Sequence, residues 1–331
     1  MLLICGIAVV DIIASGLPKI ANPGELIFTP IQTSIGGHAC NVSVDLAQMR
    51  FPKNKLQVVF PIGKDVFGIF LEKRLKDAGL KLDVFRTSSA STSLDLILII
   101  QGEDRRFHAD PGANQYLSPG HVLKIIKREK PILFYMGGIG LPEEFDEKLE
   151  DVLEKAKTLG ALTFVDIVVP YQKTWDFLKP AFRWIDIFHC NEDEAREITE
   201  SKSLEKASEE ISKLGAKFCF ITRGAKGLLA RLLNLKIRMP AFQVKVADPT
   251  GAGDAFCAGL IMQIYRLLES KANLDEMPQE KLKKILLYAS ACGAACCQGI
   301  GTTKTVKPKF IREIIREQGR ELLNKTRVEA V

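Results

Sequence analysis

The stretch ADPTGAGDAF, residues 247–256, places two glycines and two carboxylates directly before a long apolar segment. The first N–H groups of a helix have no partner inside the helix, and together with the helix dipole they form a site for anions. Gly251, Ala252 and Gly253 would leave those N–H groups open to a phosphate group. Asp254 would stand on the same turn, where a carboxylate can remove a proton from a hydroxyl that attacks phosphorus. The residues also allow a plainer interpretation, in which Asp254 only complements the helix dipole.

Two other glycine-rich phosphate signatures do not fit this stretch. The P-loop pattern GxxxxGK[ST] fails because no Lys-Ser or Lys-Thr follows Gly253. The dinucleotide pattern GxGxxG needs a glycine where Phe256 stands, and it belongs on the first strand–helix unit of a chain. Two interpretations of the turn therefore remain open, an anion hole with an adjacent base and a carboxylate that only complements the helix dipole.

Short β-rich apolar runs alternate with helical patterns over most of the chain. Segments such as residues 67–80 and 145–160 repeat apolar residues every three or four positions and end near a glycine. This alternation predicts an α/β fold, a doubly wound and mostly parallel sheet flanked by helices. Helices are also expected at about 251–270, 279–298 and 308–323. The candidate strands are residues 2–10, 56–62, 132–137, 162–169, 185–190 and 218–223.

Two strand-rich regions, residues 24–35 and 94–109, have no helix between their strands. We predict that they form a small β-sheet lid, with segments at about 12–35 and 94–110 inserted in a single domain of residues 1–331. Such a lid would shelter a ligand from water. The alternative is that they are two edge strands of the main sheet. The lid segment carries three basic side chains, which would either contact an acidic or phosphorylated sugar or be solvated edge charges: Arg105, Arg106 and His108.

Composition excludes several classes of protein. A formal charge of +6, from 46 basic and 40 acidic residues, does not predict nucleic-acid binding. The eight cysteines lie mostly in apolar segments without a CxxC pair, which indicates free thiols in a reducing cytoplasm. The apolar N-terminus lacks a basic region and is interrupted by Asp11, so it predicts a buried strand and not a signal peptide. We expect a cytoplasmic protein with no membrane or nucleic-acid partner.

Several motifs surround the candidate anion hole, and their order carries the strongest signal. DPTGAGDAFCAGL at 248–260 and GGHACNVSVDLAQM at 36–49 resemble the two signatures of the ribokinase-like, or PfkB, carbohydrate kinases. The chain is similar to this family over nearly its whole length. The other matching motifs, in family order, are Asp11, PIGKDVFG (61–68), GAN (112–114), NEDEA (191–195), TRGAKG (222–227) and ASACGAACCQGIG (289–301).

The resemblance implies a kinase that transfers the γ-phosphoryl group of ATP to a hydroxyl of a small carbohydrate. It implies Mg²⁺ as a cofactor, leaves a monovalent cation open, and makes a homodimer through the lid strands plausible. Asp254 would be the general base, and residues 251–253 would be the anion hole. Two alternatives stay open: a nucleoside kinase of the same fold, and a catalytically silent sugar or nucleotide sensor.

The resemblance also assigns binding residues. Asp11, Gly36, Gly37 and Asn41, with Asp254, would bind the sugar. Glu194 would organise Mg²⁺ through water, although Asn191 and Glu194 also fit a helix capping box. Two departures speak against ribose: His38 stands where ribokinases carry Lys, and GGIGL at 137–141 lacks an acidic residue. The residues assigned to ATP are Asn191, Thr222, Gly224, Gly227, Thr250, Gly251, Gly253, Ala291 and Gly301.

Overall fold

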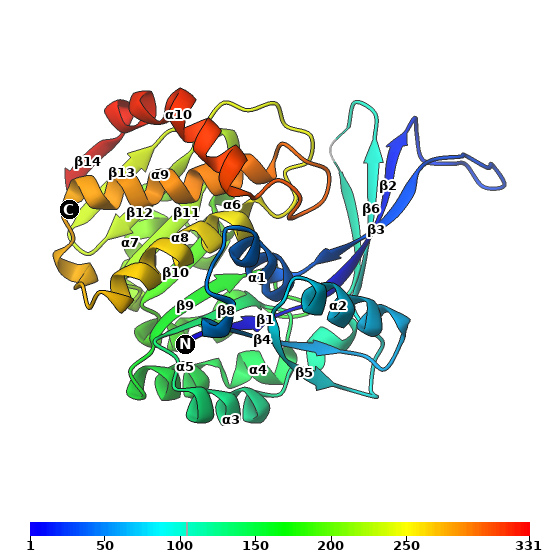
Figure 1. The fold of residues 1–331 in the computed structure, drawn as a ribbon, viewed down its shortest axis with the longest axis horizontal. Coiled ribbons are helices and arrows are strands. Elements are labelled where there is room, and N and C mark those ends of the chain that lie inside the picture. The colour runs from blue at the N-terminus through cyan, green and yellow to red at the C-terminus, as the bar shows by residue number, and fades with distance from the viewer. Residues whose placement is uncertain (104) are drawn as a thin grey trace.

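The computed structural model describes residues 1–103 and 105–331, and within them the largest element is a ten-stranded sheet. Its strand order is β14-β13-β12-β11-β10-β9-β8-β1-β4-β5 (Figure 1). Neighbours from β11 to β5 are parallel, and β12 to β14 continue the sheet in antiparallel pairs. The strands are β1 Leu2–Gly6, β4 Leu56–Ile62, β5 Lys81–Arg86, β8 Leu133–Ile139, β9 Leu162–Ile167, β10 Ile187–Asn191, β11 Phe218–Thr222, β12 Leu228–Leu232, β13 Leu235–Met239 and β14 Arg327–Ala330.

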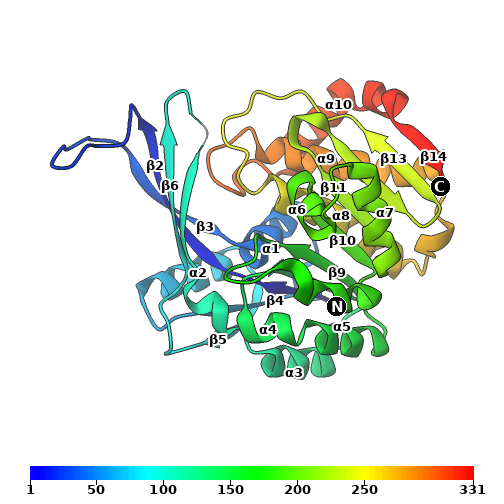
Figure 2. The same ribbon diagram turned by 180° about the vertical axis from the view of Figure 1, so that it is seen from behind.

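Helices cover both faces of this sheet, as Figures 1 and 2 show from opposite sides. Along β1, Leu2 and Ile4 join the core beneath α1, α2, α8, α9 and α10, whereas Leu3 and Cys5 join the core beneath α3 to α7. The predicted doubly wound, mostly parallel fold is confirmed. The helices are α1 His38–Gln48, α2 Val66–Asp77, α3 Pro119–Glu129, α4 Glu143–Glu147, α5 Leu149–Thr158, α6 Glu192–Thr199, α7 Leu204–Leu214, α8 Ala252–Glu269, α9 Gln279–Cys296 and α10 Pro308–Lys325.

A second sheet projects from the main one as a lid (Figure 1). Its strands run in the order β3-β2-β6-β7, with bounds β2 Val9–Leu17, β3 Ile31–Gly36, β6 Leu94–Ile100 and β7 Arg106–Asp110. A separate lid sheet is thus present, and the alternative of two edge strands in the main sheet is wrong.

The lid begins earlier in the chain than the sequence indicated. We expected one strand over 2–10, but β1 ends at Gly6 and β2 begins at Val9, so Asp11 lies within a lid strand. Of the region 24–35 that we expected to be rich in strands, residues 24–30 form no strand, and β3 begins at Ile31. Residue 104, inside the predicted segment 94–110, lies outside the described residues.

The chain order of the strands reverses between β1 and β8. From β1 the main sheet grows through β4 and β5 on one side, and later through β8 to β11 on the other. Ligands of open α/β sheets bind at the carboxyl ends of the strands beside such a reversal. There the backbones of β1 and β8 come so close that a Cβ added to Gly6 would lie 2.3 Å from the Gly137 carbonyl oxygen. This edge is where a site is expected.

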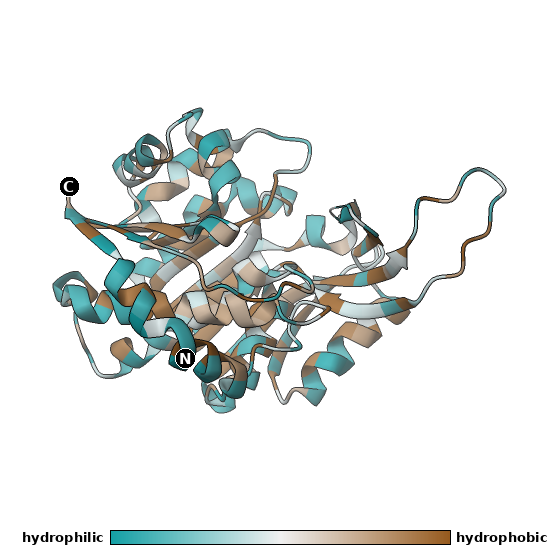
Figure 3. Cartoon of the chain, turned by 90° about the horizontal axis from the view of Figure 1, so that it is seen from above, coloured by the Kyte–Doolittle hydropathy of each residue, from teal (hydrophilic) through white to brown (hydrophobic). Residues whose placement is uncertain are grey.

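The three predicted C-terminal helices are present as α8, α9 and α10, within two residues of the expected bounds. Apolar residues fill the inside of the molecule and polar ones the outer helix faces (Figure 3). No helix in the described part of the chain combines the length and apolar character that a membrane span requires. The helices α8 and α9 pack closely at Gly259, where an added Cβ would lie 2.7 Å from Ala289 Cα.

We predict that Gly259→Ala lowers the free energy of unfolding by about 1–3 kcal/mol, because the new methyl group overpacks the contact between α8 and α9. Gly120→Ala, also in a helix, is the matched control, since its Cβ would meet nothing closer than Ser118 Oγ at 3.7 Å. Urea unfolding of both variants measures the difference. A Gly259→Ala protein as stable as the control would contradict the prediction.

Candidate functional site

The turn before α8 has the geometry that the sequence predicts. Gly251 caps the helix with a φ of 81°, which favours glycine, and a Cβ there would lie 2.9 Å from Thr302. Gly253 and Asp254 lie in the first helical turn, whose N–H groups have no acceptor inside the helix. The Ala252 N–H differs, because it already donates to the Pro249 carbonyl at 3.2 Å. The Ala252 N–H is therefore engaged within the protein, and the predicted anion hole has the N–H groups of Gly253 and Asp254 as its donors.

One oxygen of the Asp254 carboxylate is hydrogen-bonded, and the other is buried without a hydrogen-bond partner among the described residues. Asn41 Nδ2 donates to its Oδ2 at 2.8 Å, while its Oδ1 has no hydrogen-bond partner within residues 1–103 and 105–331. Burial raises the pKa of Asp254, and the nearby His38 and the bond from Asn41 oppose that rise. His38 Nε2 lies 3.9 Å from Oδ1. A fixed carboxylate with a raised pKa and a free oxygen is suited to accept a proton.

Asp11, Gly36, Gly37 and Asn41 lie around the same space as Asp254. A Cβ on Gly36 would lie 2.3 Å from Asp11 Oδ1, and one on Gly37, where φ is 82°, would lie 2.6 Å from the Ile7 carbonyl oxygen. Asn41 Oδ1 accepts from Thr302 Oγ1 at 2.7 Å, which leaves its amide group directed at Asp254. The structure thus brings together the residues that the sequence assigned to a sugar.

The space around Asp11, Asn41 and Asp254 is rich in carboxylates. Asp11 is 3% exposed, and burial together with the charges of Asp95, Asp248 and Asp254 raises its pKa to about 8. Asp11 Oδ2 has no hydrogen-bond partner in the described part of the chain. Asp95 pairs with Asp11 across β6 and β2, and burial raises its pKa to about 6. Sequence reasoning missed Asp95, whose only signal is one acid in the apolar run LDLILII.

A cavity of about 510 Å³ lies on the other side of the anion-hole turn. The predicted residues Thr222, Gly224, Gly227 and Gly253 line it. Apolar side chains and one face of α9 form the rest of its wall: Leu228, Phe242, Val244, Val246, Phe256, Ser290, Gly293, Ala294 and Cys297.

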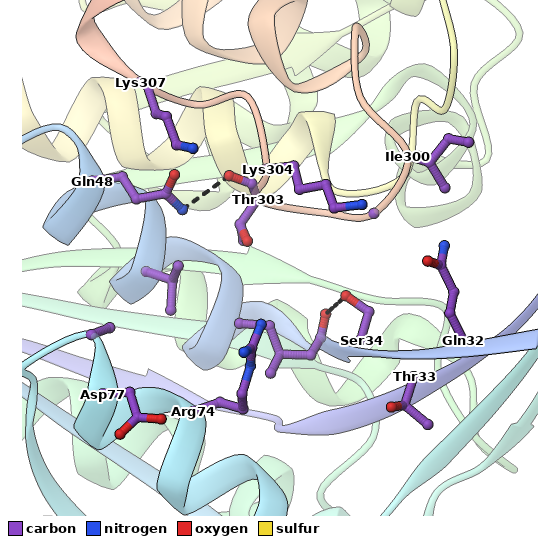
Figure 4. A pocket seen from close by; sticks show the side chains of 14 residues that line it. Gln32, Thr33, Ser34, Gln48, Arg74, Asp77, Ile300, Thr303, Lys304 and Lys307 are labelled. Carbon is purple, nitrogen blue, oxygen red and sulfur yellow. Dashed lines mark hydrogen bonds between the residues drawn. The ribbon is translucent and has the colours of Figure 1, made fainter.

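Five of the nine residues assigned to ATP do not line this cavity: Asn191, Thr250, Gly251, Ala291 and Gly301. Ala291 is fully buried in the core and does not line this cavity, because each step along α9 turns the side chain by about 100° and the cavity meets Ser290 and Ala294 instead. Gly301 lines a different cavity of about 390 Å³, between the edge strand β3 and α1, α2 and the loop after α9. Figure 4 shows Arg74, Lys304 and Lys307 around that second cavity.

Asn191 and Glu194 form the capping box that was the alternative to a metal role. Asn191 Oδ1 accepts from the N–H of Glu194 at 2.9 Å, and Glu194 Oε2 accepts from the N–H of Asn191 at 2.8 Å. Burial raises the pKa of Glu194 to about 7, although the bond from Asn191 lowers it. The adjacent Glu192 is engaged by Arg196, Arg223 and Lys226. A cation beside Glu194 would favour its charged form.

The lid arginine reaches the anion-hole turn. Arg105 Nη1 lies 3.0 Å from Asp248 Oδ1 and also donates to Thr250 Oγ1. Asp248 Oδ2 accepts from the Gly301 N–H at 3.1 Å. The charge of Arg105 is thus directed at a protein carboxylate, which differs from both expectations for it. Arg106 pairs with Glu103, and His108 is exposed on β7.

A buried polar pair that sequence reasoning missed lies behind the turn. His189 Nδ1 is 2.8 Å from Asp166 Oδ1, and His189 Nε2 is 3.3 Å from Thr222 Oγ1. His38 Nε2 is 4.0 Å from Asp166 Oδ2 on the opposite side. The signal in the sequence is weak, one acid in the mainly apolar strand β9 and one histidine in the mainly apolar strand β10.

Residues 3–309 match the family model described as pfkB family carbohydrate kinase. The chain is 27% identical over 274 residues to probable fructokinase-5 of Arabidopsis thaliana, which covers 79% of this chain and 81% of the relative. It is 27% identical over 272 residues to aminoimidazole riboside kinase of Salmonella typhimurium, covering 78% and 80%.

Solved structures show the same fold. Ribokinase from Giardia lamblia superposes with a TM-score of 0.82 at 20% identity, covering 94% of this chain and 98% of that one. Fructokinase with bound ATP from Xylella fastidiosa gives a TM-score of 0.79 at 22% identity, covering 96% and 98%.

The raised pKa of Asp11 predicts a pH-dependent stability. The folded protein holds a proton on Asp11 up to about pH 8, whereas the unfolded chain releases it near pH 4, so stability falls as pH rises between these values. Asp11→Asn removes this contribution. We expect its melting temperature to exceed that of the wild type at pH 8.5 by more than at pH 5, as measured by thermal denaturation. An equal difference at both pH values would contradict the assignment.

Proposed function

Because the chain belongs to the pfkB family of carbohydrate kinases and is therefore a phosphotransferase with an alcohol acceptor, we propose that Asp254 is the base of an ATP-dependent sugar kinase. One observation carries this proposal. Asp254, whose Oδ1 has no hydrogen-bond partner among the described residues, stands in the first turn of α8 beside Gly253, which lines the 510 Å³ cavity, while Asn41 from the residues assigned to the sugar, here called the acceptor side, bonds its other oxygen.

In this proposal the chemistry is a direct transfer. Asp254 takes the proton from a sugar hydroxyl as its oxygen attacks the γ-phosphorus of ATP, and the bond from that phosphorus to the ADP oxygen breaks. The N–H groups of Gly253 and Asp254 stabilise the negative charge on the transferred group. Thr222, Gly224 and Gly227 lie beside the phosphates, and the apolar wall formed with Ala294 accepts the adenine.

The residues fit a magnesium ion held through water. Glu194 is a carboxylate whose burial disfavours its charge, so a nearby cation would offset that cost. When bound, Mg²⁺ would neutralise charge on the phosphates. The capping box fixes the Glu194 side chain for this role, since one of its oxygens is tied to the start of α6.

The acceptor is proposed to be a neutral sugar. Asp11, Asp95 and Asp254 lie on the acceptor side, and the charge of Arg105 is directed at Asp248, so these residues offer no positive charge to an acidic sugar. Hydroxyl groups suit these carboxylates, since each can donate a hydrogen bond. A nucleoside is the second candidate, because one relative is named aminoimidazole riboside kinase.

We also propose a cytoplasmic homodimer that pairs through the lid. The lid and its loop expose large apolar side chains, among them Leu26 at 75%, Phe28 at 90% and Ile31 at 68%. The eight cysteines are all free thiols in the structure, which is consistent with a reducing compartment.

The experiment that tests the function measures ADP release with ATP and Mg²⁺ across fructose, ribose, acidic keto-sugars, phosphosugars, inositol and nucleosides. Strong turnover of one neutral sugar supports the proposal. Turnover only of a nucleoside supports the second candidate, and silence across the panel with intact ATP binding favours a sensor.

We predict that Asp254→Asn lowers kcat by about 10²–10⁴-fold, because the amide cannot take the proton. Binding of ATP should change little, since the backbone N–H groups remain in place. Steady-state kinetics and isothermal titration measure the two effects. Asp151→Asn, an exposed change on α5, is the control, and an Asp254→Asn protein with activity close to it would exclude Asp254 as the base.

Ala294→Phe tests the donor cavity. The added ring should occupy part of the 510 Å³ and raise KM for ATP by about tenfold or more, while KM for the sugar stays within about twofold. Ala294→Ser, which adds a single oxygen, should leave both values close to those of the wild type. A Phe variant with an unchanged KM for ATP would show that the nucleotide binds elsewhere.

A further inference from the structure

The buried pair Asp166 and His189 lies directly behind the anion-hole turn. Asp166 stands near the end of β9 and His189 in β10, where they are partners across the two strands. Their exposed fractions are 3% and 4%. Neither residue belongs to a motif that the sequence analysis identified, and neither has a part in the proposed transfer.

Asp166 fixes the orientation of the imidazole ring. Besides His189, the carboxylate accepts from Tyr135 Oη at 2.9 Å, the Ile167 N–H at 3.0 Å and Cys257 Sγ at 3.3 Å. Burial alone would raise its pKa, but His189, the charge of His38 and the bond from Tyr135 lower it to about 2. An ionised carboxylate only accepts hydrogen bonds, so His189 Nδ1 must donate to it.

The other side of the ring faces the candidate site. His189 Nε2 lies 3.3 Å from Thr222 Oγ1, at the end of β11 on the wall of the donor cavity. The ring packs against Phe256 with 5.4 Å between centroids, and a Cβ on Gly253 would lie 3.4 Å from its Cε1. One side chain thus contacts both the hydroxyl beside the phosphates and the helix turn that carries the anion hole.

We propose that His189, oriented by Asp166, is a positioning residue that sets the Thr222 hydroxyl and the Gly253 turn relative to the phosphates of the donor nucleotide. The inference rests on the proposed function, because it assigns the phosphates to this side of α8. His189 acts through Thr222 and touches no substrate itself.

The alternative is that the pair only completes the core. Burying two ionisable groups brings no reliable gain in stability over apolar side chains of similar volume. If the pair only completes the core, substituting His189 lowers AMP-PNP affinity and kcat by the same factor with and without the Thr222 hydroxyl. If His189 positions Thr222, substituting it has little further effect on either value once that hydroxyl is removed.

Asparagine and glutamine separate the two contacts of the ring. In His189→Gln the side-chain amide reaches the position of Nε2 and can still bond Thr222. In His189→Asn it reaches only the position of Nδ1 and keeps the bond to Asp166. Each is made alone and with Thr222→Val. His121→Asn is the matched control, because His121 Nε2 pairs with Asp83 at 2.8 Å on the outside of the molecule.

The measurements are the Kd of the ATP analogue AMP-PNP and of adenosine by isothermal titration, melting temperature, and kcat with the best acceptor of the panel. We expect His189→Asn to raise the Kd of AMP-PNP by about 3–10-fold, the equivalent of one hydrogen bond, and to leave the Kd of adenosine unchanged. We expect it to lower kcat by about tenfold or more, since small displacements of reacting groups are costly. His189→Gln should restore most of both values, and in the Thr222→Val protein His189→Asn should add little.

The inference would be overturned if His189→Gln and His189→Asn lowered AMP-PNP affinity and kcat equally. It would also be overturned if His189→Asn lowered them by the same factor in the wild-type and Thr222→Val backgrounds. A fall in melting temperature with unchanged AMP-PNP binding would likewise assign the pair to the core. Failure of the proposed function gives a different result, because the wild-type protein would then bind no AMP-PNP or phosphorylate no acceptor.

Discussion

The carboxylate of Asp248 holds together three segments that are far apart in the chain. Its Oδ1 accepts from the Thr250 N–H at 2.9 Å and from Arg105 of the lid, and its Oδ2 accepts from the Gly301 N–H after α9. A buried charge is tolerated only when such donors surround it. The anion-hole turn, the loop against which Gly251 packs and the lid therefore share one buried anchor, and displacing any of them would leave this charge partly unpaired.

Around that anchor, carboxylates gather at the carboxyl edge of the sheet and meet two opposite environments. Asp11 and Asp95 have few donors, so burial raises their pKa. Asp166 is surrounded by donors and stays charged. The first environment leaves polar oxygens for the hydroxyl groups of a ligand, whereas the second uses every oxygen within the protein. The contrast separates residues that would bind a substrate from residues that hold the site in shape.

The parts of the site that the sequence predicted are those set by local constraints. Gly251 is needed where φ is positive and Thr302 is close, and Gly253, Thr222 and Gly227 stand in short motifs with their own turns. Alternating apolar runs likewise predicted the sheet, its two helical layers and the separate lid. The lid boundary was placed wrongly because an apolar run from residue 2 to 10 does not show where the chain leaves one sheet for another.

Contacts between distant segments could not be predicted in this way. Asp166 and His189 are 23 residues apart in two mainly apolar strands, so only the pairing of β9 with β10 reveals that they meet. The family resemblance assigned Ala291 to the nucleotide, but the orientation of α9 decides that Ser290 and Ala294 face the cavity. Both cases depend on the packing of whole elements, which short motifs do not encode.

The reversal of strand order explains how the start of α8 could serve the two ligands that we propose. The chain leaves β1 directly into the lid strand β2, which carries Asp11 to the acceptor side. On the other side the end of β11 brings Thr222 to the donor cavity. The start of α8 lies between the acceptor side and the donor cavity. Its first turn therefore holds the proposed base, Asp254, at a fixed separation from the proposed anion hole. A direct transfer between two bound groups requires such a fixed separation, because the reacting atoms must approach in line.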